Sequence, residues 1–107
     1  MKELSLRPYP GVVRVYKSKK KYLKAHKKQF GTDINLDGNC GRTDGAWCAV
    51  TKQPVFLVWA VDSARMAHEL SHVIIATFTN AGITINSEHP EPFCYMLSQL
   101  MLDVKEM

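Results

Sequence analysis

The residues best suited to chemistry are two histidines and a glutamate that lie close together in the chain. His68 and His72 are four residues apart, and Glu69 directly follows the first of them. On a helix this spacing places both imidazoles on one face, one turn apart. Two neutral imidazole nitrogens on a rigid element can bind one zinc ion at about 2.0–2.1 Å each. Glu69 would then lie beside the metal as the general base for a zinc-activated water.

A catalytic zinc site also needs a third protein ligand and an open coordination position. We expect Glu91 to be this ligand, because it falls at the start of the next expected helix. A turn at Gly82 can fold that helix back against the first one. Glu88 is the second choice, and His89 is the remaining alternative.

Tyr95 is the other candidate catalytic residue. It lies four residues after Glu91, and therefore on the same face of the expected helix. Its hydroxyl could form a hydrogen bond to a zinc-binding histidine or polarise a substrate carbonyl. The alternative is a half-buried tyrosine with its hydroxyl in water.

The motif falls in a long amphipathic segment that is typical of a helix. Asp62 or Ser63 is the expected N-cap, and the helix should end near Asn80. Apolar neighbours of His72 are expected to keep this histidine from full exposure: Val73, Ile74 and Ile75.

A last helix should follow, with Ser87 or His89 as its N-cap. Pro90 and Pro92 fall in its first turn, where proline removes no hydrogen bond. The residues expected to form its buried stripe are Phe93, Met96, Leu97, Leu100, Met101 and Val104.

The preceding residues predict a first helix and three strands. Ser18 can cap a helix that ends at Phe30, before Gly31, with Leu23, His26 and Phe30 as its apolar stripe. The expected strands are residues 12–16, 46–50 and 55–60, with a hairpin turn at 51–54 and a loop over 31–45. Residues 55–60 are continuously apolar, so both faces of that strand should be covered.

The expected fold is therefore α+β, in the order β-α-β-β-α-α. Residues 1–107 should form a single minimal zincin-like domain, in which a small three-stranded sheet packs on the helix with the histidine motif and on the C-terminal helix. The three cysteines, an odd number, argue against a disulfide framework. No apolar run is long enough to span a bilayer, so we expect a cytoplasmic protein with no membrane partner.

Most of the positive charge is concentrated in one segment. Residues 17–28 hold seven lysines and no acid, and without them the formal net charge of +4 would become −3. No nucleic-acid-reading motif accompanies these lysines. The pattern favours a solvated face or the binding of an acidic partner over nucleic-acid binding. The lysines are Lys17, Lys19, Lys20, Lys21, Lys24, Lys27 and Lys28.

From Gly45 to Met101 the chain resembles the gluzincins, the HExxH metallopeptidases in which a downstream glutamate is the third zinc ligand. The matching residues are His68, Glu69, His72 and Glu91. More narrowly, residues 66–72, 80–83 and 91–95 are similar to small metallopeptidase-like proteins encoded in bacteriophage genomes.

This resemblance implies zinc-dependent hydrolysis of a peptide or protein substrate, in the host cell cytoplasm if the gene belongs to a phage. In gluzincins the strand before the active-site helix is a sheet edge that binds the substrate in extended form. By resemblance, residues 55–60 or their hairpin partner would do the same here.

A non-catalytic alternative uses the same metal differently. Zinc with four protein ligands would staple the last two helices of a binding module, a device that benefits small domains. His89 or Cys94 would supply the fourth ligand.

Overall fold

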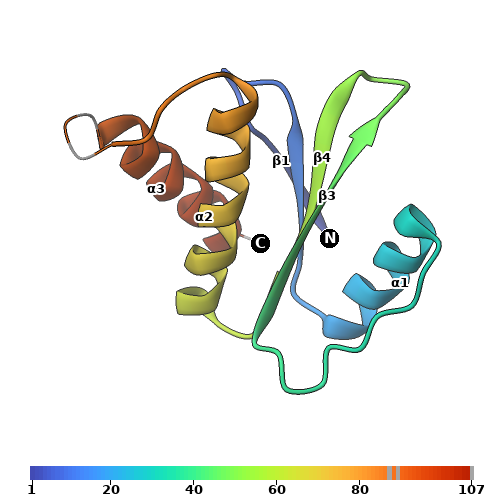
Figure 1. The fold of residues 1–107 in the computed structure, drawn as a ribbon. Coiled ribbons are helices and arrows are strands. Elements are labelled where there is room, and N and C mark those ends of the chain that lie inside the picture. The colour runs from blue at the N-terminus through green and yellow to red at the C-terminus, as the bar shows by residue number, and fades with distance from the viewer. Residues whose placement is uncertain (87, 89, 107) are drawn as a thin grey trace.

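The fold is built on a four-stranded mixed sheet with helices on both faces (Figure 1). The computed structural model describes residues 1–86, 88 and 90–106. In sheet order, the strands are β1 (Lys2–Ser5), β2 (Val12–Tyr16), β4 (Gln53–Ala60) and β3 (Gly41–Cys48). The helices are α1 (Lys19–Phe30), α2 (Ser63–Asn80) and α3 (Glu91–Lys105). The class is therefore α+β, as expected.

The sheet has one strand more than the sequence indicated. β1 pairs antiparallel with β2, and Leu4 stands opposite Val13. Leu4 is buried while its neighbours Glu3 and Ser5 are exposed, which is the alternation of an edge strand. Four residues are too few for this pattern to be distinctive in the sequence. The predicted three-stranded sheet and its β-α-β-β-α-α order are therefore wrong, and the observed order is β-β-α-β-β-α-α.

The β3–β4 hairpin is longer than expected at one end and shorter at the other. Residues 41–45, predicted as loop, pair with β4, beginning with Gly41 opposite Ala60. Partner hydrogen bonds impose the strand on this glycine-containing segment, whose own composition favours a turn. The strand ends at Cys48 rather than Val50, because the chain reverses where Lys52 N–H donates to Cys48 carbonyl oxygen at 2.8 Å.

The helices follow their local signals. Ser18 caps α1 through Lys21 N–H, and Gly31 ends it in the left-handed region at φ 75°. Asp62 caps α2 through Arg65 N–H. Pro90 is the N-cap of α3, and the two capping residues expected from the sequence, Ser87 and His89, lie outside the described residues. Among the described helices, none is long and apolar enough to cross a membrane.

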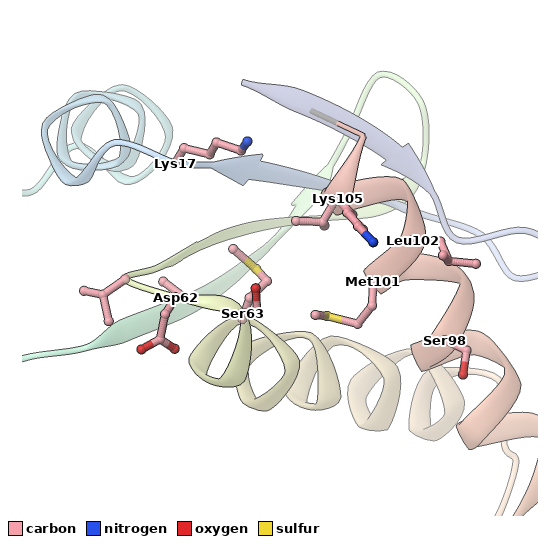
Figure 2. A pocket seen from close by; sticks show the side chains of 11 residues that line it. Lys17, Asp62, Ser63, Ser98, Met101, Leu102 and Lys105 are labelled. Carbon is pink, nitrogen blue, oxygen red and sulfur yellow. The ribbon is translucent and has the colours of Figure 1, made fainter.

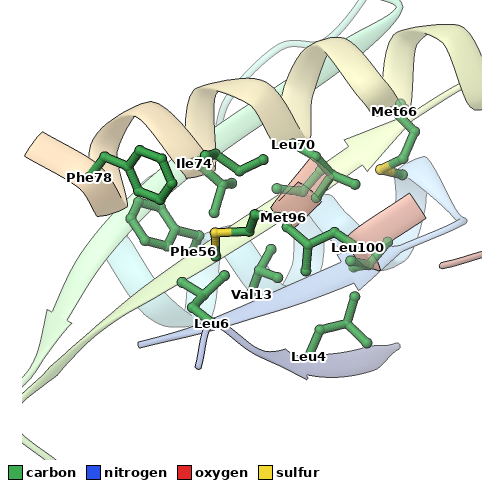
Figure 3. Close-up of a cluster of buried hydrophobic side chains, with 14 residues drawn as sticks. Leu4, Leu6, Val13, Phe56, Met66, Leu70, Ile74, Phe78, Met96 and Leu100 are labelled. Carbon is green, nitrogen blue, oxygen red and sulfur yellow. The ribbon is translucent and has the colours of Figure 1, made fainter. Parts of the chain in front are cut away.

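The sheet separates two hydrophobic cores, and the larger one fixes the orientation of α2. Figure 3 shows Leu70, Ile74 and Phe78 projecting from α2 toward the sheet. Met96 and Leu100 of α3 join the same core. On the opposite face of the sheet, α1 covers a smaller core. Residues 55–60 are all buried between the two, which confirms that both faces of this strand are covered.

Candidate metal centre

His68 and His72 lie on the exposed side of α2. The helix turns its apolar stripe to the sheet, so the side that carries the two histidines faces away from it. Both histidines are exposed. The prediction that neighbouring residues would restrict the exposure of His72 is wrong, because Val73 and Ile74 point into the core instead.

The two imidazoles are spaced as ligands of one ion. His68 Nε2 and His72 Nε2 are 3.2 Å apart, and the ring centroids are 4.8 Å apart. Two nitrogens bound to one tetrahedral zinc at about 2.0–2.1 Å would be separated by about 3.3 Å. The same separation is that of a hydrogen bond between the two rings, and it is close to the spacing of two nitrogens on one tetrahedral zinc.

Glu69 lies on the side of α2 that faces the edge strand β3. Its Oε1 accepts a hydrogen bond from Thr43 Oγ1 at 2.7 Å. A Cβ at Gly41 would lie 3.0 Å from Glu69 Oε2, so the glycine leaves the space that the carboxylate occupies. The carboxylate is thus held between the motif helix and the edge strand of the sheet.

Among the described residues, none of the predicted third ligands completes a metal-binding group with this pair. Within the described part of the chain, no three His, Cys, Asp or Glu side chains form a group that could hold a metal ion. Glu91, at the first position of α3, is exposed, and so is Glu88. His89 lies outside the described residues, and Cys94, the other proposed fourth ligand, is an exposed free thiol. The structure brings two of the three predicted ligands together.

Tyr95 is on the outer surface of α3. Its side chain is far more open than expected, with 75% of the residue exposed. Among the described residues, its hydroxyl forms no hydrogen bond to either histidine. Its predicted role depends on the same rearrangement that would bring Glu91 to the pair.

The position of β3 decides which strand could bind an extended peptide. β4 pairs with β2 on one side and β3 on the other, so residues 55–60 have no free edge. The expectation that this strand binds substrate is wrong. Its hairpin partner β3, which was the stated alternative, lies at the edge of the sheet, and Thr43 joins it to Glu69.

A polar cluster of two buried and two partly exposed residues lies on the other face of β3, and sequence reasoning missed it. We call Tyr22, His26, Arg42 and Asp44 the Asp44 cluster. Asp44 accepts hydrogen bonds from Arg42 Nε at 2.9 Å, from Arg42 Nη2 at 3.1 Å and from the Tyr22 hydroxyl. His26 Nε2 is 3.5 Å from Asp44 Oδ2, and only 5% of the histidine side chain is exposed.

The electrostatics of this cluster hold Asp44 and Tyr22 each in one protonation state. Burial raises the pKa of Asp44, but the hydrogen bonds from Arg42 and Tyr22 outweigh it, and the net pKa is below its usual value. Burial, and then the hydrogen bond to Asp44, raise the pKa of Tyr22 well above its usual value. Asp44 is therefore a carboxylate and Tyr22 a neutral phenol.

One signal for the cluster was present in the sequence. Tyr22 and His26 are four residues apart on a lysine-rich helix, so they share one face. The predicted stripe was Leu23, His26 and Phe30, yet the buried residues of α1 are Tyr22 and His26. Asp44 gave no signal, because the composition of residues 31–45 predicted a loop.

The lysines of α1 form an outer face that remains mostly open. Lys20, Lys21, Lys24 and Lys28 are exposed. Lys27 Nζ lies 3.2 Å from Asp33, and Lys19 Nζ lies 3.8 Å from Asp37. This arrangement is compatible with the solvated face and with the acidic partner that the sequence suggested.

Comparison with known proteins adds no relative. No family model, curated protein or solved structure matches this chain. The gluzincin resemblance therefore depends on the motif residues alone.

Proposed function

We propose that the chain is a zinc-dependent peptide hydrolase whose metal is held by His68, His72 and Glu91. The observation that carries the proposal is the 3.2 Å separation of the two Nε2 atoms, with the Glu69 carboxylate held on the same helix. Zinc bound there would act as a Lewis acid and lower the pKa of water toward about 7. The substrate would be a peptide or protein of the cytoplasm.

The proposal requires Glu91 to approach the histidines when metal binds. Glu91 is exposed in the first turn of α3, and Pro90 before it provides no side-chain cap. The anchors of α3, Met96 and Leu100, lie further along the helix in the shared core. A change in the first turn can therefore leave the packing of α3 on α2 intact. Metal-binding free energy offsets the cost of such ordering.

Glu69 would carry the proton transfers. It would accept the proton of the attacking water and deliver it to the leaving amine nitrogen. The hydrogen bond from Thr43 holds Oε1, which fixes the orientation of the carboxylate. Tyr95 lies one turn after Glu91 on α3, so the same movement would bring it toward the histidines. Its hydroxyl would then donate a hydrogen bond to the substrate carbonyl oxygen.

The edge strand would bind the substrate. The outer edge of β3 pairs with no other described strand, so a peptide could add to it by backbone hydrogen bonds. Thr43 and Gly41 of this strand lie against Glu69. A peptide on β3 would therefore pass close to the proposed base.

The test is hydrolysis of fluorescein-labelled casein by the zinc-loaded chain and its Glu69→Gln variant. The variant should retain zinc and lose about 10²- to 10⁴-fold in rate, because the proton acceptor is removed. Glu106→Gln, an equal change on an exposed acid at the end of α3, should leave the rate unchanged. Equal rates for Glu69→Gln and the unaltered chain would contradict the role of Glu69. Zinc binding without any hydrolysis by the unaltered chain would instead support the non-catalytic zinc module.

A further inference from the structure

The outer side of α1 carries positive charge that the described part of the chain does not neutralise. Lys20, Lys21, Lys24 and Lys28 are exposed. Among the described residues, none of these four lysines forms an ion pair with an acid. We call the four residues the lysine face.

The other three lysines of the basic segment are engaged elsewhere. Lys19 Nζ lies 3.8 Å from Asp37, and Lys27 Nζ lies 3.2 Å from Asp33. Lys17 precedes α1 and lines a cavity of about 1020 Å³ beside α2 and α3, as Figure 2 shows. The lysine face is therefore a surface of α1 alone.

The fold directs this surface outward. Tyr22 and His26 bury the opposite side of α1 against the sheet. Lys20, Lys24 and Lys28 follow at intervals of four residues, so they form one row with steps of about 6 Å along the helix axis. The helix with the proposed zinc centre covers the other face of the sheet (Figure 1). The two surfaces are therefore separate.

The arrangement of these charges does not stabilise the helix. Like charges four residues apart repel each other on a helix, and the row contains two such pairs. Lys20 and Lys21 lie in the first turn, which contains no acid, and there they add to the positive end of the helix dipole. A purely solvated surface commonly mixes charges of both signs. A face of one sign fits an anionic partner better than it fits a role in stability.

The aromatic residues of α1 distinguish between two classes of anionic partner. Proteins that bind single-stranded nucleic acid combine positive charge with aromatic side chains on which the bases stack. On α1, Tyr22 is buried, and the ring of Phe30 lies 4.6 Å from the ring of His26. Neither ring belongs to the lysine face, which therefore has charge without a stacking surface. A protein segment rich in carboxylates needs only the charge.

We propose that the lysine face binds an acidic segment of a partner protein, an extended stretch with carboxylates at alternate residues. Alternate side chains of an extended chain share one side at steps of about 6.6–6.8 Å, close to the spacing of the lysine row. Each carboxylate pairs with one lysine of the row, and Lys21 adds to the attraction. Exposed ion pairs are weak singly and are screened by salt, so the binding is salt-dependent.

The first test is fluorescence anisotropy with a labelled peptide of alternating glutamate and serine, about ten residues long so that it spans the row. A chelator is present, so that the carboxylates cannot bind to metal at the histidines. We expect saturable binding that weakens by at least about tenfold between about 20 mM and 200 mM salt. The same peptide with glutamine in place of glutamate should not bind. The absence of saturable binding, or equal binding of both peptides, would overturn the proposal.

Variants locate the surface. A chain with Lys20→Gln, Lys24→Gln and Lys28→Gln should bind the acidic peptide at least about tenfold more weakly, because three ion pairs are lost. Glutamine has nearly the helix propensity of lysine, so α1 should still form. In urea denaturation this variant should unfold at the same urea concentration as the unaltered chain or at a higher one. Unchanged binding, or unfolding at a lower urea concentration, would contradict the assignment.

A matched variant has the same net charge and keeps the lysine face. It removes three exposed cations outside α1, through Arg7→Gln, Lys52→Gln and Lys105→Gln. It should bind the acidic peptide as the unaltered chain does. Equal losses in the two triple variants would show a general charge effect and overturn the location.

Single-stranded DNA tests the class of partner. A labelled oligothymidylate with the same number of charges as the acidic peptide should bind no more tightly than that peptide, because the face has no stacking surface. DNA binding that is tighter by about tenfold or more would assign the face to nucleic acid and overturn the proposal of a protein partner.

Discussion

Two histidine-containing regions lie near opposite faces of the edge strand β3. They differ in how many of their polar side-chain groups have hydrogen-bond partners within the protein. In the Asp44 cluster, His26 is buried and the carboxylate accepts hydrogen bonds from Arg42 and Tyr22. In the motif region, His68 and His72 are exposed and contact each other. The first region is complete without any ligand. The second has two exposed imidazole nitrogens 3.2 Å apart, and it is the region that we propose binds an ion.

The two regions meet at consecutive residues of β3. Arg42 and Asp44 point to α1, while Thr43 between them points to Glu69 on α2. This follows from the alternation of side chains along a strand. The Asp44 cluster therefore fixes the strand whose other face contacts the proposed base. Variants of each region should separate a structural role from a functional one.

The largest effect on stability is expected at the centre of the Asp44 cluster. Asp44→Ala would leave the Arg42 guanidinium and the Tyr22 hydroxyl without their shared acceptor. We expect the free energy of unfolding to fall by about 2–3 kcal/mol, measured by urea denaturation, because these donors lose a charged acceptor. Asp33→Ala removes an exposed carboxylate that pairs with Lys27, and should change the same free energy by less than about 0.5 kcal/mol. Similar losses in both variants would contradict the comparison.

A smaller loss should follow removal of one donor. Tyr22→Phe keeps the ring in the core and removes only the hydroxyl that donates to Asp44. The expected loss in the free energy of unfolding is about 1–2 kcal/mol. Tyr95→Phe, the same change at an exposed tyrosine, should have almost no effect on stability. If Tyr95→Phe destabilised the chain more than Tyr22→Phe, the hydroxyl of Tyr22 would not have the stabilising role that we give it in the Asp44 cluster.

The smallest effect is in the pH dependence of stability. The pKa of Asp44 is below its usual value of 3.8 in the folded chain, so the unfolded chain binds its proton first as the pH falls. The stability that Asp44 contributes is present above about pH 4 and is lost as the pH falls further. In urea unfolding between pH 5 and pH 2, Asp44→Asn should show a shallower decline than the unaltered chain. Parallel declines would mean that Asp44 is not held as a carboxylate by the fold.

Local signals predicted the helices and the motif, and non-local pairing explains what was missed. Ser18, Gly31 and Asp62 mark helix ends through contacts within a few residues, so these ends could be read from the sequence. β1 and residues 41–45 become strands through partners that are distant in the chain. Asp44 meets Tyr22 only when that pairing forms.

The candidate metal site also combines a local feature, which the sequence predicts, with a non-local one, which it does not. The spacing of His68 and His72 is a property of one helix, and the structure confirms that they share a face. Whether Glu91 joins them depends on the connection between α2 and α3, for which the sequence carries no equivalent rule. That ligand remains a prediction, and in the described residues it does not complete a metal-binding group.

Zinc titration of the full chain, two glutamate variants and one histidine variant tests the central claim most directly. The account predicts one zinc ion per chain, with binding weakened by about 10- to 100-fold or more in Glu91→Ala and in His68→Ala. Glu88→Ala, the same change three residues earlier, should bind zinc as the unaltered chain does. Unchanged zinc affinity in both Glu91→Ala and His68→Ala would contradict the proposed centre.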